Sequence, residues 1–303
     1  MISIEEIKKF LKGEIKLSEP LAKYTSLRIG GAADCYLEPA DKDDLVNVIR
    51  YVQRSEVPFF IIGNGSNVLI SDEGYRGVVI NLEARVNRLE VRGDIVVAEA
   101  GVRTPRLVDF CIQRGFQGVE MLVGIPGTIG GAVVINAGAH GGQISDYLVE
   151  VEVFREGEVI QVTKELGDFA YRRSGFVRDV VLGAAFRLPK GNKEEVMRRR
   201  REFLVIRGKT QPLNFPNSGS IFKNPPGTYA AKLIEKVGLK GVRKGDAQIS
   251  ELHANFFINL GGAKATDVLE LMRTAREAVF RKFDITLEPE VKLVGFSTEF
   301  VTK

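Results

Sequence analysis

Apolar side chains recur at helical spacing in three long segments of the chain. In Asp41–Val57 they fall three and four residues apart, which predicts a helix with one buried face. Similar spacing predicts a helix over Asp267–Phe283, capped by Thr266. A further helix is predicted over Thr104–Arg114, begun by Thr104 with Pro105 at its first position, where a missing N–H is tolerated.

Charged residues dominate another predicted helix. Lys193–Ile206 is strongly basic, and Asn192 is its candidate cap. The run Arg198–Arg201 within it would suit nucleic acid, but no aromatic residues are interleaved and no binding-fold signature accompanies it. We therefore interpret the run as a solvated helix face. A shorter helix is predicted over Tyr229–Val237.

Short or alternating apolar runs predict the strands. Phe59–Ile62 is predicted as a short buried strand that runs into a glycine. Val91–Ala98 and Val149–Val162 are predicted as hairpins, because a glycine-containing turn separates two apolar runs in each. Further strands are predicted over Asn255–Asn259 and Ile285–Leu293.

One stretch shows neither the helical nor the strand periodicity of apolar residues. Residues 121–145 contain no Asp, Glu, Lys or Arg and are rich in glycine. Glycine at this density lets main chain approach a ligand closely and leaves N–H groups free to point at it. We expect this stretch to take part in binding.

Composition narrows the class of protein. The chain has 303 residues, of which 44% are hydrophobic and 27% charged, and this excludes a disordered, collagen-like or disulfide-scaffold protein. No apolar run is long enough for a membrane-spanning helix, and the first residues do not resemble a signal peptide. The net charge of +4 is mild and does not demand nucleic acid.

The cysteines and histidines do not indicate a metal site. Only Cys35, Cys111, His140 and His253 occur, without metal-ligand spacing. Two cysteines in a chain of this length suit a reducing compartment, so we expect a cytoplasmic protein without a metal.

Two glycine-rich segments are candidates for binding phosphate. Gly63–Asn67 follows the predicted buried strand, and its amides with the Ser66 hydroxyl would cradle a diphosphate, although an ordinary turn fits equally well. Gly124–Gly131, continuing to Asn136–Ala139, is a second uncharged cradle. Together the two segments indicate a large phosphate-bearing cofactor.

Three further segments carry reactive side chains. Arg172, in a Tyr-Arg-Arg-Ser run, is suited to a substrate carboxylate, because its planar fork binds bidentately; a surface arginine is the alternative. Ser220 would donate a proton, although a lone serine is usually a turn residue. Glu290 lies on the polar face of the last predicted strand and faces either water or a cleft.

Taken in order, the segments GNGSNVL, IPGTIGGAVVINAGA, YRRS, GSIFKNP, SELHANF and LEPEV resemble the UDP-N-acetylenolpyruvoylglucosamine reductase family. The resemblance covers nearly the whole chain, from residue 25 to residue 292. It implies an α+β fold, with an FAD-binding fold of the vanillyl-alcohol-oxidase (PCMH) type in two subdomains and a C-terminal α+β substrate-binding domain. We expect these parts at residues 1–83, 84–190 and 191–303.

The resemblance also implies the residues of the site. The catalytic residues would be Arg172, Ser220 and Glu290. Non-covalent FAD would be bound by Gly63, Asn64, Gly65, Ser66, Asn67, Gly124, Ile125, Pro126, Gly127, Thr128, Gly130, Gly131, Asn136, Ala137, Gly138 and Arg207. The substrate would be bound by Tyr171, Lys209, Lys223, Asn224 and Gln248.

The activity implied by the resemblance belongs to peptidoglycan precursor synthesis. Hydride would pass from NADPH to FAD and then to C3 of the enolpyruvyl group of UDP-N-acetylglucosamine enolpyruvate. Ser220 would then protonate C2, while Arg172 and Glu290 stabilise the enolate. The chain resembles the shorter branch of the family, because only Phe176–Leu188 separates Arg173 from the next helix, which leaves no room for the inserted tyrosine loop of other members.

Two other functions remain open at this stage. One alternative is another FAD-dependent oxidoreductase of the same fold, whose flavin is reduced by its own substrate. The other is a non-catalytic module that binds a nucleotide sugar. Under the favoured hypothesis its partners are the UDP-sugar and NADPH, with neither nucleic acid nor membrane, and we expect a monomer.

Overall fold

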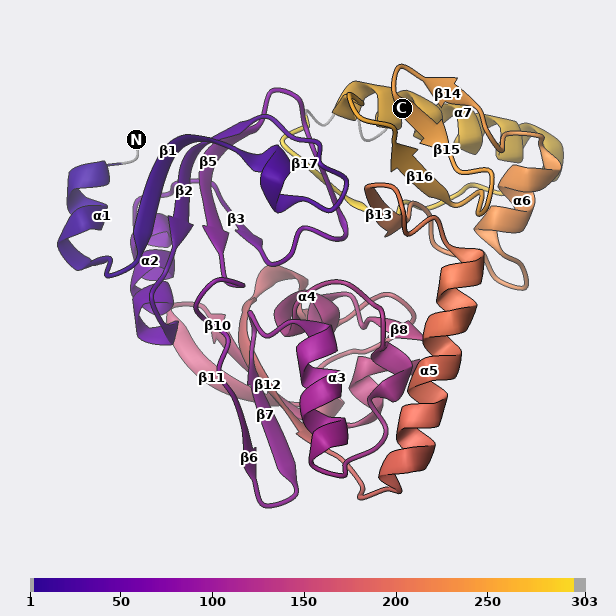
Figure 1. Cartoon of the computed structure of the whole chain (residues 1–303). Coiled ribbons are helices and arrows are strands. Elements are labelled where there is room, and N and C mark those ends of the chain that lie inside the picture. The colour runs from indigo at the N-terminus through magenta and orange to yellow at the C-terminus, as the bar shows by residue number, and fades with distance from the viewer. Residues whose placement is uncertain (1–2, 297–303) are drawn as a thin grey trace. The chain divides into compact units, whose positions relative to one another are not determined.

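The computed structural model describes residues 3–296, and their largest sheets are three sheets of four or five strands (Figure 1). The chain folds into two compact units. Unit 1 comprises the chain up to Leu17, Cys35–Asn64 and Gly77–Ile206; unit 2 comprises Ser18–Asp34, Gly65–Arg76 and the chain from Arg207. The division into residues 1–83, 84–190 and 191–303 stays a prediction.

In each of these sheets, at least one pair of neighbouring strands is not consecutive in the sequence. The first sheet has the order β1 (Glu14–Pro20), β2 (Ala32–Glu38), β5 (Tyr75–Asn81), β3 (Phe59–Ile62). The second has the order β11 (Glu158–Thr163), β10 (Leu148–Arg155), β12 (Val180–Arg187), β7 (Ile95–Glu99), β6 (Leu89–Arg92). The third, in unit 2, has the order β13 (Asn217–Ser220), β16 (Phe256–Asn259), β15 (Ala247–Ile249), β14 (Arg243–Lys244). Two further pairs are β17 (Lys292–Val294) with β4 (Val68–Ile70), and β8 (Gly138–Ala139) with β9 (Gly142–Gln143).

Seven α-helices occur within the described residues. They are α1 (Ile4–Phe10), α2 (Lys42–Arg54), α3 (Thr104–Gln113), α4 (Ile129–Val134), α5 (Lys193–Thr210), α6 (Ala230–Lys236) and α7 (Ala265–Phe283). Each unit has its own hydrophobic core: α2 and α3 bury their apolar faces in that of unit 1, and α6 and α7 in that of unit 2. No helix among the described residues is long and apolar enough to cross a membrane.

The helical periodicity located its helices correctly. The helix predicted over Asp41–Val57 is α2, and the Asp41 carboxylate accepts the Asp44 amide at 2.8 Å, as an N-cap does. Asn192 caps α5 as predicted, accepting the amides of Glu194 and Glu195, although the helix continues four residues past Ile206 to Thr210.

Two predicted caps are wrong. Thr104 is the first residue of α3 rather than its cap, and its hydroxyl donates to the Gly127 carbonyl at 3.3 Å. Thr266 lies inside α7, and the carboxylate of Asp72 accepts the amides of Ala265 at 2.7 Å and Thr266 at 3.0 Å. Asp72 lies nearly 200 residues away in sequence, so local pattern could not reveal this cap.

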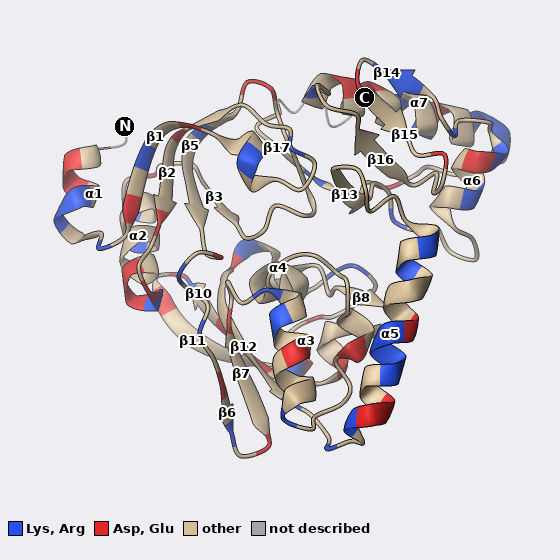
Figure 2. Cartoon of the chain, viewed as in Figure 1, with Lys and Arg blue, Asp and Glu red and all other residues tan. Residues whose placement is uncertain are grey.

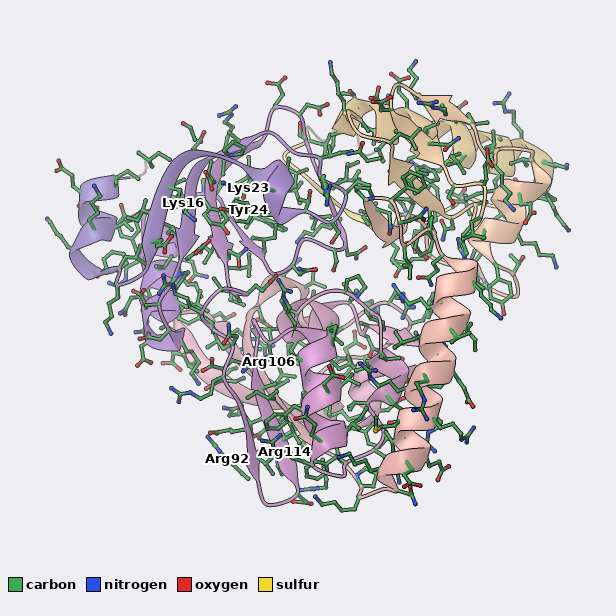
Figure 3. All side chains as sticks on the ribbon, viewed as in Figure 1. Lys16, Lys23, Tyr24, Arg92, Arg106 and Arg114 are labelled. Carbon is green, nitrogen blue, oxygen red and sulfur yellow. The ribbon has the colours of Figure 1, made fainter. Side chains whose placement is uncertain are left out.

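Both predicted hairpins are present. Strands β6 and β7 form the first, and Figure 3 labels Arg92 at its end. Strands β10 and β11 form the second, and its turn residues Glu156 and Gly157 both have left-handed φ angles, of 49° and 91°. Such a turn matches the twist of the flanking strands.

The predicted strand over Ile285–Leu293 is wrong for most of its length. Only Lys292–Val294 forms a strand, β17, which runs parallel to β4. Earlier in the segment, Pro289 makes an isolated bridge with Phe222. Proline has no N–H to donate to a ladder, so the segment changes partners there instead of continuing as one strand.

The basic run on α5 is used in ion pairs. Arg199 contacts Glu120 at 2.8 Å, Arg200 contacts Asp109 at 2.9 Å and Arg198 contacts Glu202 at 2.7 Å. Figure 2 shows both basic and acidic residues along this helix. These contacts support the interpretation as a solvated, salt-linked face.

We predict that Gly65→Ala destabilises the protein more than Gly93→Ala. Both glycines have similar left-handed φ angles, of 61° and 65°, so each substitution costs about 1–2 kcal/mol of backbone strain. A methyl group at Gly65 would also lie 2.0 Å from the Tyr24 carbonyl oxygen, whereas Gly93 has open space, so roughly 1–3 kcal/mol more is lost at Gly65. Urea unfolding measures the difference; equal losses would contradict the steric argument.

Candidate functional site

The loop Gly63–Asn67 connects β3 to β4. Between described residues, the main-chain amides of Asn64, Gly65 and Asn67 donate no hydrogen bond. Gly65 is nevertheless buried, and buried N–H groups normally have partners. The loop therefore has unsatisfied donors of the kind that receive an anion.

The second glycine-rich loop, 124–131, divides its amides between two uses. The amides of Ile129 and Gly130 donate to the carbonyls of Val102 and Ala100, each at 2.9 Å. Those of Gly127, Thr128 and Gly131 donate none within residues 3–296. The expectation that this stretch leaves its N–H groups free is therefore right only in part.

The two loops touch within unit 1. A Cβ built on Gly63 would lie 2.2 Å from Thr128 Oγ1, so the main chain at 63 packs directly against this side chain. Gly131, in contrast, is exposed and its nearest neighbouring atom would be 3.8 Å from an added Cβ. Within unit 1, the open space at Gly131 and the unsatisfied amides of Asn64, Gly127, Thr128 and Gly131 fit a phosphate-bearing cofactor such as FAD.

Asn136 lies at the end of α4 and is fully buried with a φ of 47°. Its side-chain amide donates to Gln143 Oε1 and to the Ala170 carbonyl, both at 2.9 Å. The side chain is therefore committed to the protein. The next residue is engaged as well, because the Ala137 amide donates to the Ala132 carbonyl and its carbonyl accepts the Ile144 amide, each at 2.8 Å.

Arg172 is held against the same segment. Its Nη2 donates to the Gly138 carbonyl at 2.7 Å, and its guanidinium carbon lies 5.2 Å from the centre of the Tyr171 ring. Its φ of 54° is unusual for a residue with a side chain and costs of order 1–3 kcal/mol. Unit 1 thus brings Arg172 to the loop predicted to hold the flavin.

Unit 2 brings Ser220 and Glu290 together. Ser220 ends β13, which pairs with β16 through a register shift at Gly219, whose φ is 75°. The amide of Glu290 donates to the carbonyl of Ile221, the residue after Ser220, at 2.8 Å. The pairing of β13 is therefore irregular just before Ser220, and the main chain after Ser220 is fixed by the Glu290 amide.

Asn255 is a residue of this site to which sequence analysis assigned no role. It is 2% exposed, its Oδ1 accepts the Phe222 amide at 3.0 Å, and its Nδ2 donates to the Phe222 carbonyl at 2.8 Å. Its own carbonyl accepts the Ile221 amide at 2.9 Å. A buried asparagine inside the SELHANF segment was the signal that could have revealed this clamp.

Asn67 joins the first loop to the Glu290 segment within unit 2. Its Nδ2 donates to the Glu290 carbonyl at 3.1 Å, and its own carbonyl accepts the Lys292 amide at 3.0 Å. The side chain predicted to bind a cofactor therefore holds the main chain of a predicted catalytic residue.

The other predicted residues differ in how the structure uses them. Lys223 Nζ lies 3.1 Å from Glu288 Oε2. Asn224 Oδ1 accepts the amide of Ala230 at the start of α6, and Gln248 donates to the Gly241 carbonyl, each of which is a structural contact. Lys209 and Tyr171 are exposed. Burial lowers the pKa of Arg207, which marks a cation partly withdrawn from water.

The cysteines have no place in this site. Both are free and buried, and burial raises the pKa of Cys111 to about 12, so this thiol stays protonated. Among the described residues no group of His, Cys, Asp or Glu side chains has the arrangement of a metal site.

Comparisons with known proteins point to one family. A model of the C-terminal domain of UDP-N-acetylenolpyruvoylglucosamine reductase matches residues 211–294, and an FAD-binding-domain model matches residues 33–163. The chain is 44% identical to UDP-N-acetylenolpyruvoylglucosamine reductase of Chloroherpeton thalassium, over the whole of both chains. It is 45% identical to that of Geobacter metallireducens, over 94% of this chain and 95% of the relative.

Solved structures agree with the sequence comparisons. The crystal structure of UDP-N-acetylenolpyruvylglucosamine reductase from Thermus caldophilus is similar with a TM-score of 0.81 at 38% identity, covering 94% of this chain and 100% of that one. Berberine bridge enzyme from Eschscholzia californica shares only the fold, with a TM-score of 0.50 at 15% identity over 63% of this chain and 43% of that one. The α+β, FAD-binding fold of the PCMH type expected from the sequence is confirmed.

We predict that Asn255→Ala lowers the free energy of unfolding by about 1–3 kcal/mol. The substitution leaves the buried Phe222 amide and carbonyl without their side-chain partner. Asn214→Ala is the control, because Asn214 is exposed on the chain leading to β13. Urea unfolding measures both variants, and an Asn255 variant as stable as the control would show that the clamp contributes nothing.

Proposed function

Because this chain belongs to the UDP-N-acetylenolpyruvoylglucosamine reductase family, a family of FAD-dependent oxidoreductases, we propose that it reduces the enolpyruvyl group of UDP-N-acetylglucosamine enolpyruvate with NADPH. The product is UDP-N-acetylmuramate, a precursor of peptidoglycan. The observation that carries the proposal is the juxtaposition of Ser220 and Glu290 through the Ile221 carbonyl.

The glycine-rich loops are the proposed holders of FAD. The unsatisfied amides of Asn64, Gly65 and Asn67 suit its diphosphate. Asn136, Ala137 and Gly138 would lie near its flavin. When bound, FAD supplies hydride transfer from NADPH to C3 of the substrate. Ile125, Pro126, Gly127, Thr128, Gly130 and Gly131 would line the same cradle, with Arg207 nearer the flavin.

Ser220 is the proposed proton donor. Addition of hydride at C3 leaves the electron pair at C2, spread into the neighbouring carboxylate, and the Ser220 hydroxyl delivers a proton to C2. Three hydrogen bonds to Asn255 hold the residues that follow Ser220. The Ile221 amide donates to the Asn255 carbonyl, and the Asn255 side chain bonds to the amide and the carbonyl of Phe222, so the end of the strand is rigid. A proton donor positioned in this way contributes about 10²- to 10⁴-fold in rate.

Arg172 and Glu290 are the proposed stabilisers of the enolate. The planar Arg172 guanidinium, restrained by the Gly138 carbonyl, would bind the carboxylate on which negative charge develops. The Glu290 carboxyl would orient and polarise the same group. The main chain of Glu290 is held at its amide by the Ile221 carbonyl and at its carbonyl by the Asn67 side chain.

The remaining residues would bind the UDP-sugar. Lys223 would bind the diphosphate through its ammonium group, which also forms an ion pair with Glu288. Lys209 and Tyr171 are exposed. Asn224 and Gln248 would contact the substrate from positions held by their hydrogen bonds to Ala230 and Gly241. We propose a cytoplasmic monomer of the shorter branch, in which η5 (Gly175–Arg178) and β12 replace a tyrosine loop.

A different flavoenzyme of the same fold is the second candidate. That enzyme would be reduced by its own substrate, and a non-catalytic module would bind ligand without oxidising NADPH. One assay separates all three: whether NADPH oxidation by the purified yellow protein depends on UDP-N-acetylglucosamine enolpyruvate. NADPH oxidation that needs this substrate supports the proposal, and its absence contradicts it.

We predict that Ser220→Ala retains reduction of its flavin by NADPH but loses about 10²- to 10⁴-fold in product formation, because only the second half-reaction needs the proton. Ser218→Ala is the control: its hydroxyl, two residues earlier, is buried without a hydrogen-bond partner among the described residues. Stopped-flow absorbance of the flavin and product analysis separate the two half-reactions. Normal turnover by Ser220→Ala would remove the serine from the mechanism.

We predict that Arg172→Lys lowers kcat about a hundredfold, because an ammonium cannot replace a planar fork that contacts both Gly138 and a carboxylate. Arg173→Lys is the matched control, since Arg173 is exposed and pairs with Asp168. Steady-state kinetics decide the matter, and similar kcat values for the two variants would exclude Arg172 from the site.

A further inference from the structure

A carboxylate outside both glycine-rich loops lies between them. Glu83, two residues after β5, accepts hydrogen bonds from Asn64 Nδ2 at 3.0 Å and from Arg103 Nε at 2.6 Å. Only 18% of its side chain is exposed, against 61% for Arg103. No sequence pattern singled out this residue.

The main chain around Glu83 is itself anchored. Its amide donates to Asn81 Oδ1 at 2.8 Å, and its carbonyl accepts from Asn87 Nδ2 at 2.9 Å. Asn81 also donates to the Gly63 carbonyl, at 3.4 Å. Arg106, labelled in Figure 3, donates from α3 to the Asn87 carbonyl at 2.8 Å. The carboxylate is therefore presented from a rigid turn.

Arg103 extends the connection to the second loop. Its main chain forms a β-bridge with Thr128, and Thr128 packs against Gly63. Glu83, Arg103, Thr128 and the Gly63–Asn64 pair consequently form a closed ring of contacts inside unit 1. Each loop is held by the other and by one ion pair.

The ring has a physical reason. Glycine-rich main chain loses much conformational entropy when it becomes ordered, so a loop that is already ordered binds more tightly. A charge-assisted hydrogen bond from Asn64 to a sheltered carboxylate is strong enough to provide this order. Pairing with Arg103 also compensates the negative charge of Glu83, which would otherwise disfavour an anionic ligand nearby.

We propose that Glu83 is a positioning residue for FAD: it holds Asn64 directly, and the Thr128 loop through Arg103, in the shape that receives the cofactor. This inference rests on the proposed function, because it takes FAD as the ligand. The role is one of binding, so it is tested by affinity rather than by turnover.

The test is titration of FAD into the apo-protein, followed by flavin fluorescence. Glu83→Ala is expected to raise the Kd about tenfold, and Glu83→Gln, which keeps an acceptor for Asn64 but loses the charge, about threefold. Glu90→Ala, which removes the partner of Arg92 on the β6–β7 hairpin, is the matched control and should bind FAD like the unaltered protein.

A double-mutant cycle distinguishes positioning from a general loss of stability. Arg103→Ala and Glu83→Ala should each raise the Kd for FAD. Because both substitutions break the same connection, the Kd of the double variant should be about that of the weaker-binding single variant. An unchanged Kd for Glu83→Ala, or additive losses in the cycle, would overturn the proposal. If Glu83→Ala does not fold, the isosteric Glu83→Gln is the test. An unchanged Kd for FAD in that variant would also overturn the proposal. Failure of the unaltered chain to bind FAD would instead contradict the proposed function.

Discussion

The hydrogen bond from the Glu290 amide to the Ile221 carbonyl is the interaction on which the candidate chemistry of unit 2 depends. Because it joins two main chains, it fixes the separation of the segments that carry Ser220 and Glu290 whatever their side chains do. Asn255 holds one side of this contact and Asn67 holds the other. Ile221 is fully buried beneath it, so the pair is supported by the core and not by solvent-exposed contacts.

In unit 1, hydrogen bonds of neighbouring residues hold the glycine-rich loops in shape. In the proposed FAD site, main chain would receive the ligand through unsatisfied donors, yet such loops do not hold a shape by themselves. The neighbours of the free amides are therefore tied down: Ile129 and Gly130 bond to the chain ahead of α3, and Asn136 spends its side chain on Gln143 and Ala170. Arg172, in a left-handed conformation, is part of the same arrangement.

Much of the fold could be predicted because its signals are local. The periodicity of α2 and α7 and the glycine turns of both hairpins reflect one face buried in a core or a backbone twist that only certain residues accept. The errors share a cause as well. The cap of α7 comes from Asp72, and the segment before β17 changes partner at Pro289, so both depend on residues remote in sequence.

The sequence alone determined which residue types were available and, through its ordered motifs, the family to which the chain belongs. Only the tertiary structure decided what each polar side chain does. Asn64, Asn67, Asn136 and Asn255 look alike in a sequence, but each is committed to a different partner. Hydrogen bonding depends on distances of about 3 Å between groups that folding alone brings together, and no local pattern encodes those distances.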